Sequence, residues 1–306
     1  MKYRLELVFA MLIFGTLGLI TQYIPMSGFG ISFIRSVFGL LFFLVYRCFQ
    51  KEKVDWIRMK QEFARLLLSG VFLSLSWIFL FTAFQIMPVG QATILYYMAP
   101  VMIMLYGMVF EREGNCIPKI VAILACLIGL IMTIGIPESV AEIRGIGCAL
   151  IAAFAYALYV IFGRKSSVPA TEKNLVQFSV SFLMTFPFFM WHRDYAQAFS
   201  VSAIGAMLTI GIIHTGIAYF LYVRAIAHLK SSEISIMSYI DPLTSFLISI
   251  LILKETTTPV MAIGAGIMLL SLVGYELSDK LLLLKKRSTN VPEVAVTNSN
   301  DYTMSS

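Results

Sequence analysis

The chain has 306 residues, of which 59% are hydrophobic and 13% are charged, and its mean hydropathy is +0.85. A soluble domain carries about twice that share of charge, so the composition excludes an ordinary water-soluble protein. The net charge of +6 does not indicate a nucleic-acid partner. The basic residues lie between apolar runs, which is typical of the inner ends of membrane helices.

Ten apolar stretches approach the roughly 20 residues that a membrane-spanning helix requires. They cover residues 5–24, 30–49, 64–86, 89–110, 117–136, 143–163, 174–192, 203–225, 232–253 and 258–279. The longest connection, residues 50–63, is basic and amphipathic and is predicted to lie on the membrane surface.

The positive charges predict the orientation of the chain. With a cytoplasmic N-terminus, nineteen of the 23 Lys and Arg residues fall on the inner side. Only Arg144, Arg193 and Lys254 fall on the outer side, and Arg35 lies within the second segment. This bias predicts that both termini are cytoplasmic.

The sequence also repeats itself at an offset of 142 positions. Residues 79–113 align without a gap with residues 221–255. The matched pairs include uncommon residues: Tyr97 with Tyr239, Pro100 with Pro242, and Arg112-Glu113 with Lys254-Glu255. Each unit holds five helices, an odd number, so the second unit is predicted to be inverted in the membrane.

We therefore predict an all-α integral membrane fold with two inverted five-helix repeats. The first repeat covers residues 1–137 and the second covers residues 143–280. The polar remainder, residues 281–306, is predicted to be a disordered cytoplasmic tail.

The arrangement resembles the EamA family of the drug/metabolite transporter superfamily. The resemblance runs from residue 5 to about 280. It rests on the repeat pattern and on these motifs: Phe33-Ile34-Arg35, Pro100, Arg112-Glu113, Ile240-Asp241-Pro242 and Leu253-Lys254-Glu255. An acid often precedes the second proline in that family, as Asp241 does here. Ala99 and Gln177 stand where an acid and an arginine would recur, so the repeats are not equivalent.

The resemblance implies solute transport by alternating access through a central cavity. It places the first, third, fourth, sixth, eighth and ninth helices around the cavity and the fifth and tenth at the periphery.

Asp241 is the leading candidate for substrate contact or for proton coupling. An acid in mid-membrane costs at least ~2.5 kcal/mol, so it is expected to face water, a partner or the bundle interior. It shares a polar helix face with Ser238, Ser245 and Ser249. A structural acid bonded to a neighbouring helix is the alternative.

Several other residues are candidates for the same site. Arg35 is interpreted either as an anion-binding group or as an anchor of its helix. His214 lies mid-helix and is either a titrating group or a neutral, hydrogen-bonded one. Pro100 and Pro242 are hinge candidates. The aromatic residues near helix centres are expected to face the interior or to pack between helices: Trp77, Tyr96, Tyr97, Tyr156, Tyr159, Tyr219 and Tyr239. Gln22 and Gln85 are weaker candidates, and Gly264–Gly266 is interpreted as a packing surface.

These features favour a secondary transporter that exports a small amphipathic or amino-acid-like solute across the cytoplasmic membrane of a prokaryote. The expected partners are the solute, membrane lipid and a coupling proton, with no cofactor or metal; the oligomeric state is left open. An integral-membrane enzyme acting on a lipid-linked substrate is the alternative. The chain lacks the common catalytic motifs and a second acid near Asp241, which disfavours that alternative.

Overall fold

The computed structural model describes residues 1–49, 55–110, 117–134, 139–164, 166–193, 200–226, 228–229, 237–271 and 273–274. No strand occurs in these ranges, which confirms the predicted all-helical architecture for this part of the chain. A helix satisfies its backbone hydrogen bonds internally, which an apolar chain in lipid requires.

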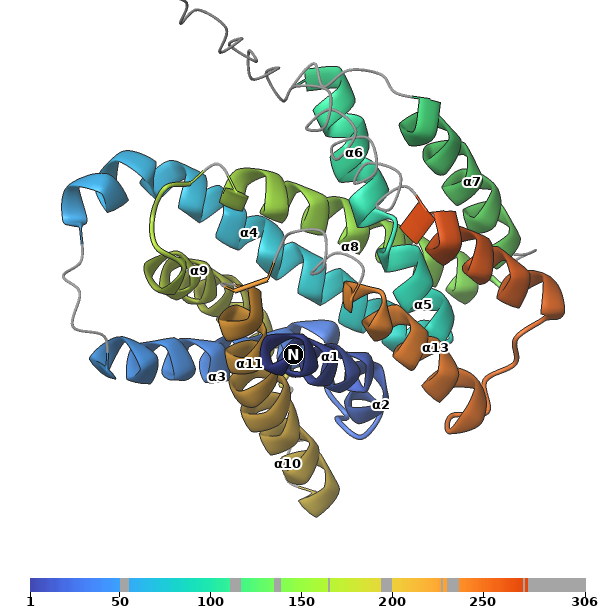
Figure 1. Cartoon of the computed structure of the whole chain (residues 1–306). Coiled ribbons are helices and arrows are strands. Elements are labelled where there is room, and N and C mark those ends of the chain that lie inside the picture. Colours follow the sequence, from blue (N-terminus) through green and yellow to red (C-terminus); the bar gives the residue numbers. More distant parts are fainter. Residues whose placement is uncertain are drawn as a thin grey trace, which may run out of the picture.

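The helices follow the predicted segments (Figure 1). The first half of the chain forms α1 (Lys2–Gly15), α2 (Leu17–Thr21), α3 (Gly28–Phe49), α4 (Trp56–Ile86), α5 (Val89–Tyr96), α6 (Ala99–Phe110) and α7 (Ile117–Ile134). The second half forms α8 (Val140–Arg164), α9 (Ala170–Trp191), α10 (Val201–Leu208), a π-helix η2 (Thr209–Ile217), α11 (Ala218–Ile226), α13 (Ile240–Leu251) and a final helix, Pro259–Ser271.

Seven helical spans in the described ranges are long and apolar enough to cross a membrane. Three shorter apolar helices, Ile120–Ile134, Ile240–Leu251 and Pro259–Ser271, lie in the other three predicted segments. The multi-pass character is thus supported, whereas the count of ten crossings and the orientation of the termini stay predictions.

The start of α4 corrects one expectation. Its 31 residues correspond to a length of about 46 Å, well beyond the ~30 Å hydrocarbon core. Asp55 caps the helix by accepting a hydrogen bond from the backbone N–H of Arg58 at 3.0 Å. Residues 56–63 therefore continue the third segment as helix and do not form a separate surface piece. Residues 50–54 lie outside the described ranges.

Both proline-containing segments break at equivalent positions. α5 ends at Tyr96 and α6 begins at Ala99, with a turn at Tyr97 and Met98. Helical residues 237–238 are likewise separated from α13 by a turn at Tyr239. Each break lies just before Pro100 or Pro242, whose ring clashes with the carbonyl four residues earlier.

The pairs of helices that pack together stay the same when each segment of the first half is swapped with the corresponding segment of the second half. α4 packs on α8, and α1 packs on α11, which are the third-with-sixth and first-with-eighth segments. The second and seventh segments, α3 and α9, pack together, as do the fourth and ninth through α5 and α13 (Figure 1). This exchange symmetry is what a two-repeat fold requires. The repeat boundaries stay a prediction.

Candidate functional site

A central cavity of about 290 Å³ lies between the two halves. Its walls come from helices and from the turn at Tyr97, and most of the lining is apolar or aromatic. Its residues are Met11, Phe14, Leu17, Gly18, Arg35, Leu73, Trp77, Leu80, Phe84, Thr93, Tyr96, Tyr97, Ala99, Pro100, Tyr156, Tyr159, Tyr219, Tyr222, Ser238, Asp241 and Ser245. They come from the first, third, fourth, sixth, eighth and ninth segments, with Arg35 added from the second. This volume suits a small solute.

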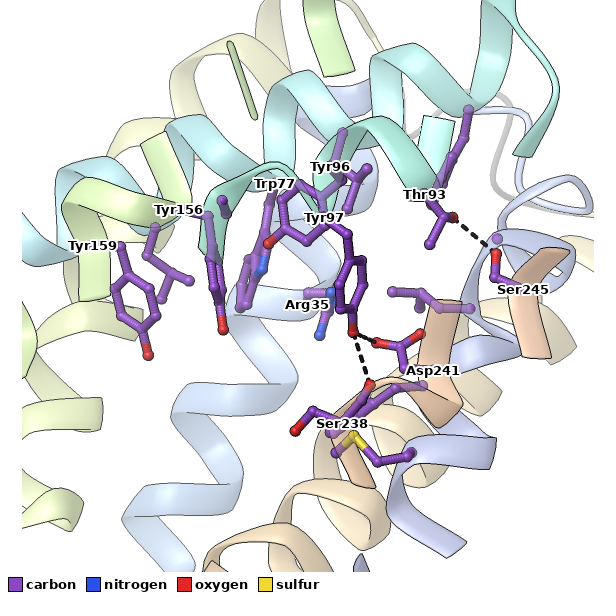
Figure 2. A pocket seen from close by; sticks show the side chains of 18 of the residues that line it. Arg35, Trp77, Thr93, Tyr96, Tyr97, Tyr156, Tyr159, Ser238, Asp241 and Ser245 are labelled. Carbon is purple, nitrogen blue, oxygen red and sulfur yellow. Dashed lines mark hydrogen bonds between the residues drawn. The ribbon is translucent and has the colours of Figure 1, made fainter. Parts of the chain in front are cut away.

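Asp241 presents its carboxylate to the cavity from the first turn of α13 (Figure 2). The hydroxyl group of Tyr97 lies 3.1 Å from Asp241 Oδ2 and 3.2 Å from the carbonyl oxygen of Ser238. While Asp241 is ionised both oxygens only accept, so this single hydroxyl proton is shared between them. The breaks before the two prolines place these groups together at the centre of the molecule.

Arg35 reaches the same space from α3 (Figure 2). It is only 5% exposed, and the centre of its guanidinium group lies 4.2 Å from the ring centroid of Trp77 and 5.6 Å from that of Phe81. Within the described ranges its buried Nε has no hydrogen-bond partner. No ion pair joins Arg35 to Asp241 in this part of the chain, although both line the cavity.

Tyrosines form a continuous aromatic wall. The ring centroids of Tyr96 and Tyr156 are 5.3 Å apart, and those of Tyr156 and Tyr159 are 5.5 Å apart. The rings of Tyr219 and Tyr222 pack edge to face at 6.1 Å. Such a wall offers π-faces and hydroxyl groups to a ligand with an apolar body.

Tyr239, Pro242 and His214 were predicted for the site but lie outside the cavity lining. Tyr239 is 6% exposed and packs against apolar neighbours, with its ring 6.3 Å from that of Tyr97. Pro242 is also buried, one residue beyond Asp241. His214 is buried in the π-helix, where it contacts Thr16 and the backbone of Thr209.

Gln22 and Gln85 lie away from the central cavity. Gln22 donates to the carbonyl oxygen of Phe84 at 2.9 Å, and Gln85 donates to that of Met26. They share a separate hollow beside the connection between α2 and α3.

Some lining residues were not named from the sequence. Thr93 is one of them, and it bonds through its hydroxyl group at 2.8 Å to Ser245, which the sequence analysis had placed on the polar face of Asp241. Phe14 and Tyr222 complete the wall. Helical spacing held a signal for Thr93, because it precedes Tyr97 by four residues. In the described ranges, no group of three His, Cys, Asp or Glu side chains is arranged to hold a metal ion.

The fold and the cavity define a class, namely a helical multi-pass membrane protein with a solute-sized chamber between two related halves. The chain belongs to the EamA-like transporter family, whose sequence profile matches residues 3–135 and again residues 143–275.

Relatives of the chain carry transporter names. It is 29% identical over 247 residues to the uncharacterized transporter YxxF of Bacillus subtilis, covering 78% of each chain. It is 26% identical over 291 residues to the uncharacterized inner membrane transporter YicL of Salmonella typhimurium, covering 91% of this chain and 96% of that one. A protein of known crystal structure shares the fold with a TM-score of 0.64 at 16% identity, covering 91% of this chain and 98% of its own. These findings indicate a membrane transporter and not an enzyme.

Proposed function

We propose that the protein exports a small amphipathic, amino-acid-like solute across the cytoplasmic membrane of a prokaryote, in exchange for protons, by alternating access. In this proposal ten helices cross the membrane as two inverted repeats, and both termini are cytoplasmic. The observation that carries the proposal is a cavity with one cationic and one acidic side chain that do not pair with each other.

An unpaired charge in a low-dielectric chamber is stabilised by a ligand of opposite charge. Arg35 would take an acidic group of the solute, with its guanidinium face held on Trp77. Asp241 would take an amine, and the tyrosine wall would contact the apolar body. Together these groups favour a solute that carries both charges and an apolar part.

The coupling follows from the chemistry of one carboxylate. Asp241 can hold either a proton or the cationic group of the solute, and occupation by one disfavours the other. A transporter that changes face only with this position occupied would exchange solute for protons. An inward proton gradient would then drive the solute outward. Pro100 and Pro242, beside the two helix breaks, would let the halves of each broken segment move separately.

The test is flux through purified protein in liposomes, with labelled amino acids and related amines and acids, with and without a pH gradient. We expect saturable flux of a zwitterionic solute that the gradient accelerates. Asp241→Asn removes the titrating group and should abolish the acceleration, whereas Asp241→Glu should retain part of it.

If Asp241→Asn keeps its gradient-driven flux, the coupling role is wrong. If wild-type protein moves no solute of the panel, with or without the gradient, the proposed substrate class is wrong.

A further inference from the structure

We propose that Glu255 is the latch of the outer gate, holding α13 to the start of α5 until the cavity opens to the outer face. Glu255 would thus be a positioning residue for transport that does not touch the solute. The inference rests on the alternating access and orientation proposed above. It concerns a basic-Glu motif, Lys254-Glu255, that the central cavity does not use.

The N-terminus of α5 receives no capping bond from its own N-cap residue, Pro88. The first backbone N–H groups of a helix have no partners within the helix. Here the carboxylate of Glu255 accepts from the N–H of Val89 at 2.9 Å and from that of Gly90 at 3.5 Å. A carboxylate at this end is also favoured by the helix dipole. The cap of a helix in the first half therefore comes from the second half.

The backbone after α13 is shaped to deliver this carboxylate. Lys254 adopts a positive φ of 53°, a left-handed conformation that is costly for a residue with a Cβ. The N–H of Glu255 then bonds to the carbonyl oxygen of Ser249 at 3.0 Å. The Ser249 hydroxyl donates to the Glu255 carboxylate. The chain thus turns back over the end of α13 toward α5.

Below the latch, α5 and α13 are joined by two further polar contacts, each one helical turn deeper. Thr93 bonds to Ser245 at 2.8 Å, and then Tyr97 bonds to Asp241 at 3.1 Å (Figure 2). The three contacts form a polar zipper that runs from the helix ends to the carboxylate of the candidate site. A change at Asp241 is therefore connected to the latch through two packed helices.

Close packing seals the same end of the cavity. Gly90 lies so near Ser249 that an added Cβ would meet the serine Cβ at 2.6 Å. Gly18 is equally tight against the side chain of Val89, and Gly15 against that of Thr244. The first, fourth and ninth segments thus meet here without space between them. In this proposal a solute reaches the cavity from this face when α5 and α13 separate, which requires Glu255 to leave the α5 N–H groups.

The experiment measures from which face a cavity residue is reached. Ser238→Cys places a reporter thiol on the lining, in a chain whose four native cysteines are replaced by alanine. A membrane-impermeant maleimide is applied to intact cells and to inverted vesicles.

Glu255→Ala should raise the ratio of outer-face to inner-face labelling rates about tenfold, because a charge-assisted cap stabilises a helix end by about the free energy that corresponds to this factor. Ser249→Ala, which removes one hydrogen bond to Glu255 and keeps the Cβ packing, should shift the ratio in the same direction by less.

The matched control is Asp55→Ala. Asp55 also caps a helix with a carboxylate, but it caps its own helix, α4, and joins no two repeats. Its loss should leave the ratio unchanged. An unchanged ratio in Glu255→Ala overturns the latch, and so does an equal shift in Asp55→Ala. Should Glu255→Ala fail to fold, an unchanged ratio in Ser249→Ala overturns it. Labelling from one face only in the reference chain, even with solute present, contradicts alternating access itself and the latch with it.

Discussion

Arg35 is the residue whose surroundings most narrow the kind of ligand that the cavity can bind. It is nearly fully buried, its face is stacked on Trp77, and its Nε is left without a hydrogen-bond partner in the described ranges. A desolvated cation–π contact stabilises by about 2 kcal/mol, which offsets only part of the cost of burying the charge. The remaining hydrogen-bonding capacity of Arg35 is available to an anionic group in the cavity.

Arg35→Gln should lower the apparent affinity for solutes with a carboxylate ten- to a hundredfold, since a hydrogen bond to a charged group contributes about 1.5–3 kcal/mol. The affinity for the decarboxylated amine should change little. Competition of both compounds against labelled solute in liposomes measures the difference. Arg47→Gln is the control, because Arg47 lies on the same helix but pairs with Glu172 at 3.3 Å outside the cavity. Equal loss for both solutes in Arg35→Gln would leave Arg35 as a structural anchor.

His214 is held by hydrogen bonds at both ring nitrogens. Its Nδ1 lies 3.2 Å from the carbonyl oxygen of Thr209, which only accepts, so Nδ1 carries a proton. Its Nε2 lies 2.9 Å from the hydroxyl oxygen of Thr16, whose own proton is donated to the carbonyl oxygen of Ile13 at 2.7 Å. These contacts tie the break between α1 and α2 to the π-helix, and both interpretations of His214, titrating or neutral, stay predictions.

The sequence predicts those cavity residues whose polar or charged side chains would be unfavourable in contact with lipid. Asp241, Arg35 and the mid-helix tyrosines are expensive in lipid, so their presence alone predicts an interior position. Thr93 was missed because a threonine in lipid can satisfy itself by bonding to the carbonyl four residues earlier, as it does to Val89 at 2.8 Å. The absence of an Arg35–Asp241 ion pair was unpredictable, since it depends on the side-chain directions of residues on two helices far apart in the sequence, α3 and α13.

Where two helices cross closely, glycines make room for the contact, and only the structure shows which glycine faces which neighbour. Gly264, on the final helix, faces Gly129 of α7, and an added Cβ would lie 2.7 Å from the Gly129 carbonyl oxygen. Gly266, two residues along, has no neighbour within 4 Å of such a Cβ. The sequence predicted a packing surface over Gly264–Gly266, and only one of its two glycines packs closely.

Gly264→Ala should therefore destabilise the protein by about 1–3 kcal/mol, because backbone must shift to admit the methyl group. Gly266→Ala should be neutral or stabilising by ~0.5–1 kcal/mol, since alanine favours the helix. Thermal unfolding of both variants in the same detergent checks the difference. Equal melting temperatures would show that α7 and the final helix adjust freely at their crossing.

Other features of the elements follow from context that a sequence pattern does not contain. The eighth predicted segment is expected to be one apolar α-helix, yet its middle, Thr209–Ile217, is a π-helix. Within it the side-chain hydroxyl of Thr215 donates to the carbonyl oxygen of Ile210 at 3.0 Å. An added Cβ at Gly211 would meet the ring of Phe38 at 2.3 Å, so tertiary packing is tight at this place. The helix breaks at Tyr97 and Tyr239 could be predicted from the sequence. Pro100 and Pro242 follow them, and a proline inside a helix removes a backbone hydrogen bond and interrupts the helix.

For the whole molecule, two independent features favour the same arrangement. Packing pairs are preserved when the halves are exchanged, which pure apolar composition would not enforce. Nineteen of the 23 basic residues fall on one predicted side, which predicts a cytoplasmic position for both termini. If each half crosses the membrane five times, as proposed, the halves are inverted, and inversion would let one fold open alternately to either side.

The topology is tested with single cysteines in a chain whose native cysteines are replaced. Asp55→Cys and Ser167→Cys, both at exposed positions, should react with an impermeant maleimide only in inverted vesicles. Ser139→Cys and Ser200→Cys, also exposed, should react only in intact cells.

Three crossings are predicted between residues 55 and 139, and one between 139 and 167, so consecutive reporter cysteines should lie on opposite sides of the membrane. If residues 55 and 139 react on the same side, one of the three predicted segments between them, most simply the short helix Ile120–Ile134, does not cross, and the first half no longer inverts onto the second. Reaction of all four on the side opposite to that predicted would instead keep the crossings between residues 55 and 200 and overturn the predicted orientation, while the direction of exchange would still be set by the proton gradient.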